Sequence, residues 1–172
     1  LWTRQQMHGS GRTDSDIRRE LAQDRLTAIR PGVYASSTEL TNRTAAQHYM
    51  VRVRATASAT DGVVSHQSAA VVHGFSMWKP DLRLVHMTVD RAKSGRTTTR
   101  RHVHAAPLGP ADVVDVDGMR VTSPARTVAD LARTLTFEQA VCVGDSALRT
   151  GTVTRESIAD SVMSVSYTHL TL

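Results

Sequence analysis

The start of the chain combines short apolar patterns with turn signals. Ile17 and Leu21 lie four residues apart, as on one face of a helix, and they predict a helix over residues 14–24. Thr13 precedes this helix in a sequence typical of a helix N-cap. A shorter helical segment is expected over residues 2–8. The chain therefore starts with two predicted helices joined by a short glycine-containing turn.

The pattern then changes from helical spacing to short strands. Residues 25–29 and 33–35 are predicted as strands on either side of an Arg-Pro-Gly turn. Two helices followed by a two-stranded ribbon are the element order of a winged helix-turn-helix, a DNA-binding module. We expect such a domain over residues 1–35, truncated at its N-terminus because the first residue is Leu and not Met and leaves no room for an element before the segment at 2–8.

A polar stretch divides the chain at residues 36–44, which are predicted as a linker. Residues 45–164 mix helical and strand periods, and an Asp-Gly pair between two valine-containing runs favours a tight hairpin. The expected fold class is α+β, with the winged helix-turn-helix followed by a small mixed α/β domain. Helices are predicted over 44–59 and 137–149 and after Ser65 and Ser123, and strands over 82–89, 101–107, 113–116 and 119–122.

Composition narrows the class of protein. The 172 residues include 21 Lys and Arg against 16 Asp and Glu, and this modest excess favours a polyanionic partner. No run approaches the roughly 18 apolar residues of a membrane span. The single cysteine, Cys142, excludes an internal disulfide and a cysteine-based zinc site. We expect a cytoplasmic protein without membrane association.

The helix predicted over residues 14–24 carries the candidate DNA contacts. A short helix fits the major groove when its apolar side packs on the protein and its outer side reaches the bases. Arg18, Arg19 and Gln23 are expected on that outer side. Arg25 and Arg30, on or near the ribbon, are expected to hold phosphates. The alternative is a solvated helix whose charges pair with one another.

Several blocks of the sequence resemble AbiEi-type antitoxins of actinobacteria. The two most specific blocks are the Arg-Pro-Gly-Val-Tyr segment at 30–34 and the Thr-Ser-Pro-Ala-Arg-Thr segment at 122–127. Further blocks lie at 16–21, 64–74 and 145–149, so the resemblance covers about residues 2–155.

The resemblance implies an antitoxin-like transcriptional repressor that binds the double-stranded operator DNA of a toxin–antitoxin operon. Its functional partner would be a toxin, thought to act as a nucleotidyltransferase, that is opposed without direct complex formation. Many relatives carry a further C-terminal domain similar to very-short-patch-repair endonucleases. The alternative is therefore the DNA-targeting portion of such a nuclease. The resemblance assigns no catalytic residue, cofactor or metal to this chain, and it leaves the oligomeric state open.

The end of the chain departs from the preceding pattern. Residues 165–172 resemble the translation of a transposon end used in sequencing adapters, and we expect them to be a non-native tail. The alternative is an ordinary C-terminal strand.

Residues 91–101 carry five positive charges and no acid in a segment rich in Gly, Ser and Thr. This composition suits contact with phosphates, with Arg96, Arg100 and Arg101 as the expected contacts. The alternatives are a solvated loop, or a protein-interaction scaffold whose basicity is incidental.

Two further groups of residues have a chemical and a structural interpretation. His102 and His104 lie two apart and would share a metal, but no third ligand is fixed, so structural or surface histidines are expected. Ser65 and His66 suggest nucleophilic catalysis, but helix capping and a partly buried imidazole explain them with fewer assumptions. No enzyme activity and no metal site are therefore predicted.

Overall fold

The computed structural model describes residues 1–89 and 96–167, with the side chains of Arg96 and of residues 165–167 excepted. The fold is mixed α+β, as predicted. The chain forms two compact units, Leu1–Ala59 and Thr60–Leu172, which are considered one at a time.

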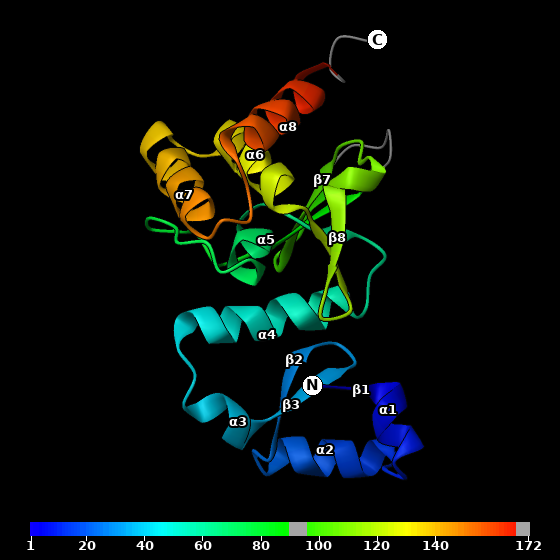
Figure 1. Ribbon diagram of the computed structural model, residues 1–172. Coiled ribbons are helices and arrows are strands. Elements are labelled where there is room, and N and C mark those ends of the chain that lie inside the picture. The colour runs from blue at the N-terminus through cyan, green and yellow to red at the C-terminus, as the bar shows by residue number, and fades with distance from the viewer. Residues whose placement is uncertain (90–95, 168–172) are drawn as a thin grey trace. The chain divides into compact units, whose positions relative to one another are not determined.

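The first unit has a three-stranded antiparallel sheet in the order β1-β3-β2 (Figure 1). Two helices precede the β2–β3 hairpin, as predicted, but Trp2 and Thr3 form the strand β1 and not the start of the first helix. The elements are β1 (Trp2–Thr3), α1 (Arg4–Gly9), α2 (Asp14–Ala22), β2 (Leu26–Arg30), β3 (Val33–Ser36), α3 (Ser37–Thr41) and α4 (Ala45–Ala57).

A small apolar core joins α1, α2 and the hairpin. Met7, Ile17, Leu26 and Tyr34 form this core, and Ile17 is the one residue of α2 that is buried. The predicted N-cap is confirmed, because the Thr13 side chain accepts a hydrogen bond from the backbone N–H three residues later in a complete capping box. Local signals therefore sufficed to place α2.

The predicted linker and domain boundary differ from the structure. Residues 36–44 contain α3, whose Leu40 packs with Ala35 and with Val51 of α4. Helix α4 therefore belongs to the first unit, whereas the sequence assigned it to the second. The composition of 36–44 suggested a linker because Leu40 is its single apolar residue, and one buried leucine leaves no periodic pattern.

The second unit has a six-stranded sheet in the order β6-β7-β5-β4-β9-β8. Pairs β5–β7 and β4–β9 are parallel and the other pairs are antiparallel. Its elements are β4 (Val63–Val64), α5 (His66–Val72), β5 (Val85–Val89), β6 (Arg96–Thr97), β7 (Arg101–Ala105), the 3-10 turn η1 (Pro110–Asp112), β8 (Val113–Val116), β9 (Met119–Thr122), α6 (Pro124–Thr134), α7 (Phe137–Arg149) and α8 (Arg155–Tyr167).

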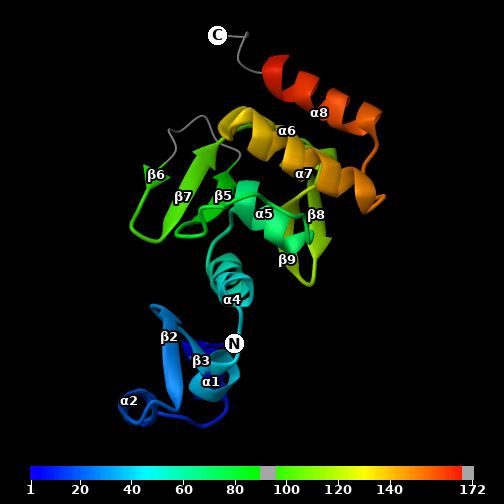
Figure 2. The ribbon, with the colours of Figure 1, turned by 90° about the vertical axis from the view of Figure 1, so that its left-hand side faces the viewer.

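Helices α5 to α8 lie on the same side of this sheet (Figures 1 and 2). Helix α5 packs against β5, β9 and α6, and α6 packs in turn against α7 and α8. Val128 and Leu131 of α6 and Val143 and Ala147 of α7 lie in one buried cluster with Phe75. The strand predicted to start at residue 82 begins at Val85. Helix α8 continues to Tyr167, so it includes the first three residues of the segment expected to be a non-native tail. Residues 168–172 of that segment lie outside the described part.

A single buried arginine connects α6 to the segment between β7 and β8. Arg126 is 2% exposed, and its Nε donates to Oδ1 of Asp130, four residues further along the same helix, at 2.9 Å. Its Nη1 donates to Asp112 Oδ2 at 2.9 Å and to the carbonyl oxygen of Pro107 at 3.1 Å. Burial raises the pKa of Asp130 and the Arg126 charge opposes that rise. The arginine therefore compensates a carboxylate that burial would otherwise destabilise.

The β8–β9 turn supplies a test of the backbone conformation. Asp117 and Gly118 have φ of 52° and 74°, and an added Cβ at Gly118 meets no atom within 4 Å. We expect Gly118→Ala to lower the free energy of unfolding by about 1 kcal/mol, because L residues disfavour positive φ. In Gly144→Ala the added Cβ also meets open space, but the position is helical, so stability should rise by up to about 1 kcal/mol. Urea unfolding of both variants checks the opposite signs.

The Arg126 contacts supply a second test. We expect Arg126→Met to lower the free energy of unfolding by about 3–5 kcal/mol, because it leaves the Asp130 carboxyl buried without its cation. Arg133→Met, at an exposed position on the same helix, should change it by less than about 0.5 kcal/mol. Equal effects in urea unfolding would contradict the structural role assigned to Arg126.

Candidate functional site

Helix α2 presents a basic outer face. Arg18, Arg19 and Gln23 are exposed, as expected for a helix whose Ile17 side is buried. Gln23 is the residue at which the helix ends. The structure thus brings the three predicted base contacts onto or next to one solvent-facing surface.

Ion pairs divide the arginines around α2 into two groups. Arg19 contacts Asp16 at 2.5 Å, and Arg12 contacts Glu20 at 3.4 Å. Arg18 and Arg25 are exposed and form no ion pair with any residue that the structure describes. The alternative of a self-paired helix therefore applies to Arg19, whereas Arg18 and Arg25 carry positive charge that is free to meet an external anion.

Arg30 has a different place from the one expected. Its Nη1 donates to the carbonyl oxygens of Ala55 and Thr56 at 3.4 and 3.3 Å, at the end of α4. Carbonyls at a helix C-terminus lack intrahelical partners and carry partial negative charge, which a guanidinium satisfies. Arg30 thus stabilises α4, and we leave it out of the candidate interface.

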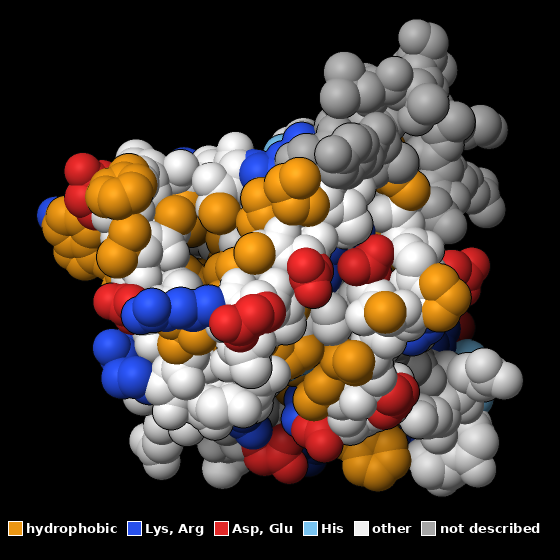
Figure 3. All heavy atoms as spheres, turned by 45° about the horizontal axis from the view of Figure 1, so that its top comes forward, with side chains coloured by type: hydrophobic (Ala, Val, Ile, Leu, Met, Phe, Trp, Pro, Cys, Tyr) orange, Lys and Arg blue, Asp and Glu red, His pale blue; other side chains and the backbone are white. Residues whose placement is uncertain are grey.

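The second basic segment belongs to the other unit. Arg100 is exposed between β6 and β7, while Arg101 lies on β7 and lines a concavity of about 770 Å3 with Arg120 and Val103. The side chain of Arg96 and the whole of residues 90–95 fall outside the described part. Figure 3 shows basic, acidic and hydrophobic side chains interspersed over one face, without a broad basic surface there. The segment is therefore a candidate contact of the second unit, considered separately from α2 of the first.

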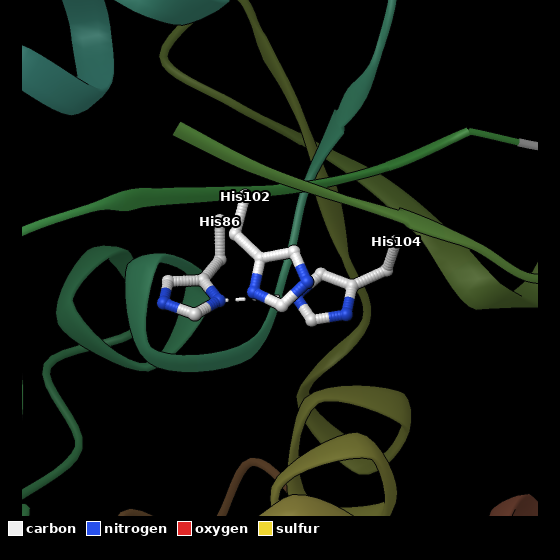
Figure 4. A group of neighbouring side chains, drawn as sticks. All are labelled: His86, His102 and His104. Carbon is white, nitrogen blue, oxygen red and sulfur yellow. Dashed lines mark hydrogen bonds between the residues drawn. The ribbon is translucent and has the colours of Figure 1, made fainter. Parts of the chain in front are cut away.

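Three imidazoles converge on the sheet of the second unit (Figure 4). His86 comes from β5, and His102 and His104 come from β7, which pairs with β5 in parallel register. Residues two apart on a strand share a face, and the register sets His86 opposite His102. His86 Nδ1 and His104 Nε2 lie 3.0 Å apart in a hydrogen bond.

This convergence corrects one argument made from the sequence. His102 and His104 were expected to lack a third ligand partner, but His86 supplies a third imidazole. The three side chains offer nitrogen atoms that all lie within 4.8 Å of one another. The alternation of residues 82–89 did place His86 on one face of a strand. The missing information was that β5 pairs with β7, a parallel contact that no local pattern predicts.

A fourth histidine lies against this group. The His66 ring stacks on the His104 ring with centroids 3.6 Å apart and planes 14° apart. His66 is buried at the start of α5 with φ of 51°, and its Nδ1 lies 3.0 Å from Ser65 Oγ. Ser65 occupies the predicted N-cap position, but its side chain forms no capping hydrogen bond. Since Ser65 is fully buried, a substrate has no direct access to its hydroxyl.

Burial and mutual proximity keep these rings neutral. Burial, followed by the neighbouring imidazoles, lowers the pKa of His66 to about 2 and the pKa of His104 to about 3. Burial and His102 lower the pKa of His86 to about 4, against a small opposing effect of Asp81. The buried Arg126 cation also lowers the pKa of His66. His66, His86 and His104 are therefore neutral near pH 7, and each ring has one nitrogen lone pair available.

Comparison with known proteins adds no identification. No family model matches this chain, and no curated protein matches it. No helix in the part of the chain that the structure describes is long and apolar enough to cross a membrane. The candidate sites are therefore the α2 face of the first unit and the histidine group of the second.

The lowered histidine pKa values predict acid destabilisation in metal-free buffer. An unfolded histidine has a pKa of about 6.5, so below this pH the unfolded chain takes up protons that folded His66, His86 and His104 do not. The free energy of unfolding should be highest above about pH 6.5 and should fall as the pH is lowered to about 5. Thermal unfolding with a chelator present measures this slope. We expect His104→Gln to make the slope shallower and His48→Gln, an exposed position, to leave it unchanged.

Proposed function

We propose that this protein is a DNA-binding transcriptional regulator, an antitoxin-like repressor of a toxin–antitoxin operon. The observation that carries the proposal is the unpaired positive charge of Arg18, on the outer side of a short helix, and of Arg25, which follows that helix. The resemblance to AbiEi-type antitoxins supports the finer part of the proposal, including the toxin as a functional partner without direct complex formation. Such a repressor acts in the cytoplasm, where its operator lies.

The dimensions and packing of α2 support its role as the reading helix. Its nine residues span about 13 Å, and the major groove, about 12 Å wide, admits a helix side-on. Ile17 anchors one side in the core, so the adjacent Arg18 faces outward without loss of apolar burial. Arginine suits this position because its guanidinium forms paired hydrogen bonds with guanine.

The hairpin that follows α2 supports a role in phosphate contact. Arg25 stands between α2 and β2, and the positive-φ Gly32 makes the tight turn to β3. Arg30 holds this hairpin to the end of α4 through two carbonyl oxygens. A hairpin fixed in this way would present Arg25 to the DNA backbone at a defined distance from the reading helix.

The first test is the salt dependence of DNA binding by the whole chain. We expect binding to a duplex taken from upstream of the protein's own coding sequence to weaken steeply with salt, because phosphate contacts release counterions. The Arg18→Ala/Arg25→Ala variant should bind at least about tenfold more weakly. For this variant, the slope of log affinity against log salt concentration should become shallower by about 2. Fluorescence anisotropy of the labelled duplex measures both.

A charge-matched variant controls this experiment. Arg133→Ala/Arg149→Ala removes two exposed arginines from the second unit and should leave the affinity nearly unchanged. Equal losses in the two variants would contradict the proposed interface, because binding would then follow net charge alone. Binding that survives the α2 substitutions and disappears in Arg100→Ala/Arg101→Ala would move the interface to the start of β7. A scrambled duplex of the same length separates operator recognition from general affinity for DNA.

A further inference from the structure

We propose that His86, His102 and His104 form a binding site for a divalent first-row transition-metal ion, with zinc as the best-fitting ion. The three residues lie on the two parallel strands β5 and β7 and point toward one another (Figure 4). This site is independent of the DNA-binding face, because it uses no residue of the first unit.

The spacing of the nitrogen atoms suits this ion. Zinc binds histidine nitrogens at about 2.0–2.1 Å in a tetrahedron, which sets neighbouring ligand atoms about 3.3 Å apart. The His86 and His104 nitrogens are already 3.0 Å apart, and all three ligand atoms lie within 4.8 Å. Binding of one ion by all three residues therefore requires side-chain rotation that shortens the longer separations.

The backbone that carries the ligands is well supported. Strand β5 pairs with β4 and β7, and β7 pairs with β5 and β6, so both strands have neighbours on each side. The parallel register fixes His86 opposite His102 and Thr88 opposite His104. Sites built on strands inside a sheet hold their ligands more accurately than sites built on loops. The ligand positions are therefore set before any ion arrives.

The donor set selects the class of ion. Three imidazoles without a carboxylate suit zinc, copper or nickel and do not suit magnesium or calcium, which prefer oxygen ligands.

Two neighbouring groups define the surroundings of the ion. The His66 ring stacks on the His104 ring, and His66 is not among the three histidines whose nitrogen atoms converge. The His102 and His104 rings also lie nearly parallel, with centroids 4.0 Å apart, so one of them must turn about its side-chain bonds for both to bind one ion. Thr88 is 1% exposed, its hydroxyl has no hydrogen-bond partner in the described structure, and strand alternation puts it on the histidine face of β5. Three protein ligands leave one position open on a tetrahedral ion, as in zinc sites that also bind water.

The buried guanidinium nearest the site is paired locally. Arg126 lies close enough to lower the pKa of His66, and it contacts both Asp112 and Asp130. The two carboxylates reduce the repulsion that the Arg126 charge exerts on a bound cation.

Metal titration of the chelator-treated, dialysed full-length protein tests the proposal. We expect one equivalent of Zn2+ to bind and to raise the midpoint of thermal unfolding, because the folded state alone has the assembled site. One equivalent of Co2+ should give the intense visible absorption of a tetrahedral site. Mg2+ and Ca2+ should produce neither change. A weak octahedral Co2+ spectrum, or no binding at millimolar Zn2+, would overturn the proposal.

Variants identify the ligands. His102→Gln and His104→Gln should each weaken Zn2+ binding at least tenfold, whereas the exposed His48→Gln should leave it unchanged. Unchanged binding in either sheet variant would contradict the assignment. Nitrogen-15 NMR of the wild-type imidazoles gives a result that does not depend on how a variant folds. Zn2+ should shift the resonances of these three histidines, and shifts confined to other histidines would place the metal elsewhere.

Discussion

The second unit depends on one buried guanidinium. Arg126 reaches from α6 to Asp112 and to the carbonyl oxygen of Pro107, and so fixes the path of the chain between β7 and β8 to a helix that packs on α5, α7 and α8. The cost of burying this charge is offset by two carboxylates and a carbonyl. Removal of the guanidinium would leave the Asp130 carboxylate buried without its cation.

The same part of the unit holds four neighbouring histidines. The His66 ring stacks on the His104 ring, His86 and His104 share a hydrogen bond, and burial lowers the pKa of these three rings. The convergence of three imidazole nitrogen atoms is the basis of the metal site proposed above.

The first unit follows a different logic. Its core is small, with Met7, Ile17, Leu26 and Tyr34, and its outer side carries charges that are only partly paired within the chain. Asp16 and Glu20 neutralise Arg19 and Arg12, which leaves Arg18 and Arg25 for an external partner. The proposals for the two units rest on separate residues, and either one stands or fails without the other.

Local sequence signals determined the elements that depend on neighbours a few residues away. The Thr13 cap and the Ile17–Leu21 spacing predicted α2, the Asp117–Gly118 turn predicted the β8–β9 hairpin, and the proline after Ser123 predicted the start of α6. Caps, turns and helical periodicity act over at most about four residues, so they are readable without tertiary information.

Only the tertiary structure decided how distant residues meet. Parallel pairing of β5 with β7 brings His86 to His102 and His104, 16 and 18 residues further on, and nothing in the local pattern specifies which strands pair. Arg30 was expected to hold DNA phosphates, but its guanidinium donates hydrogen bonds to the carbonyl oxygens of Ala55 and Thr56, at a helix end 25 residues away. Helix α4 belongs to the first unit because its Val51 packs against Leu40, which lies within the polar stretch that resembles a linker. Composition and spacing fix what each segment forms, while the free energy of burying side chains against distant partners decides which segments share a site.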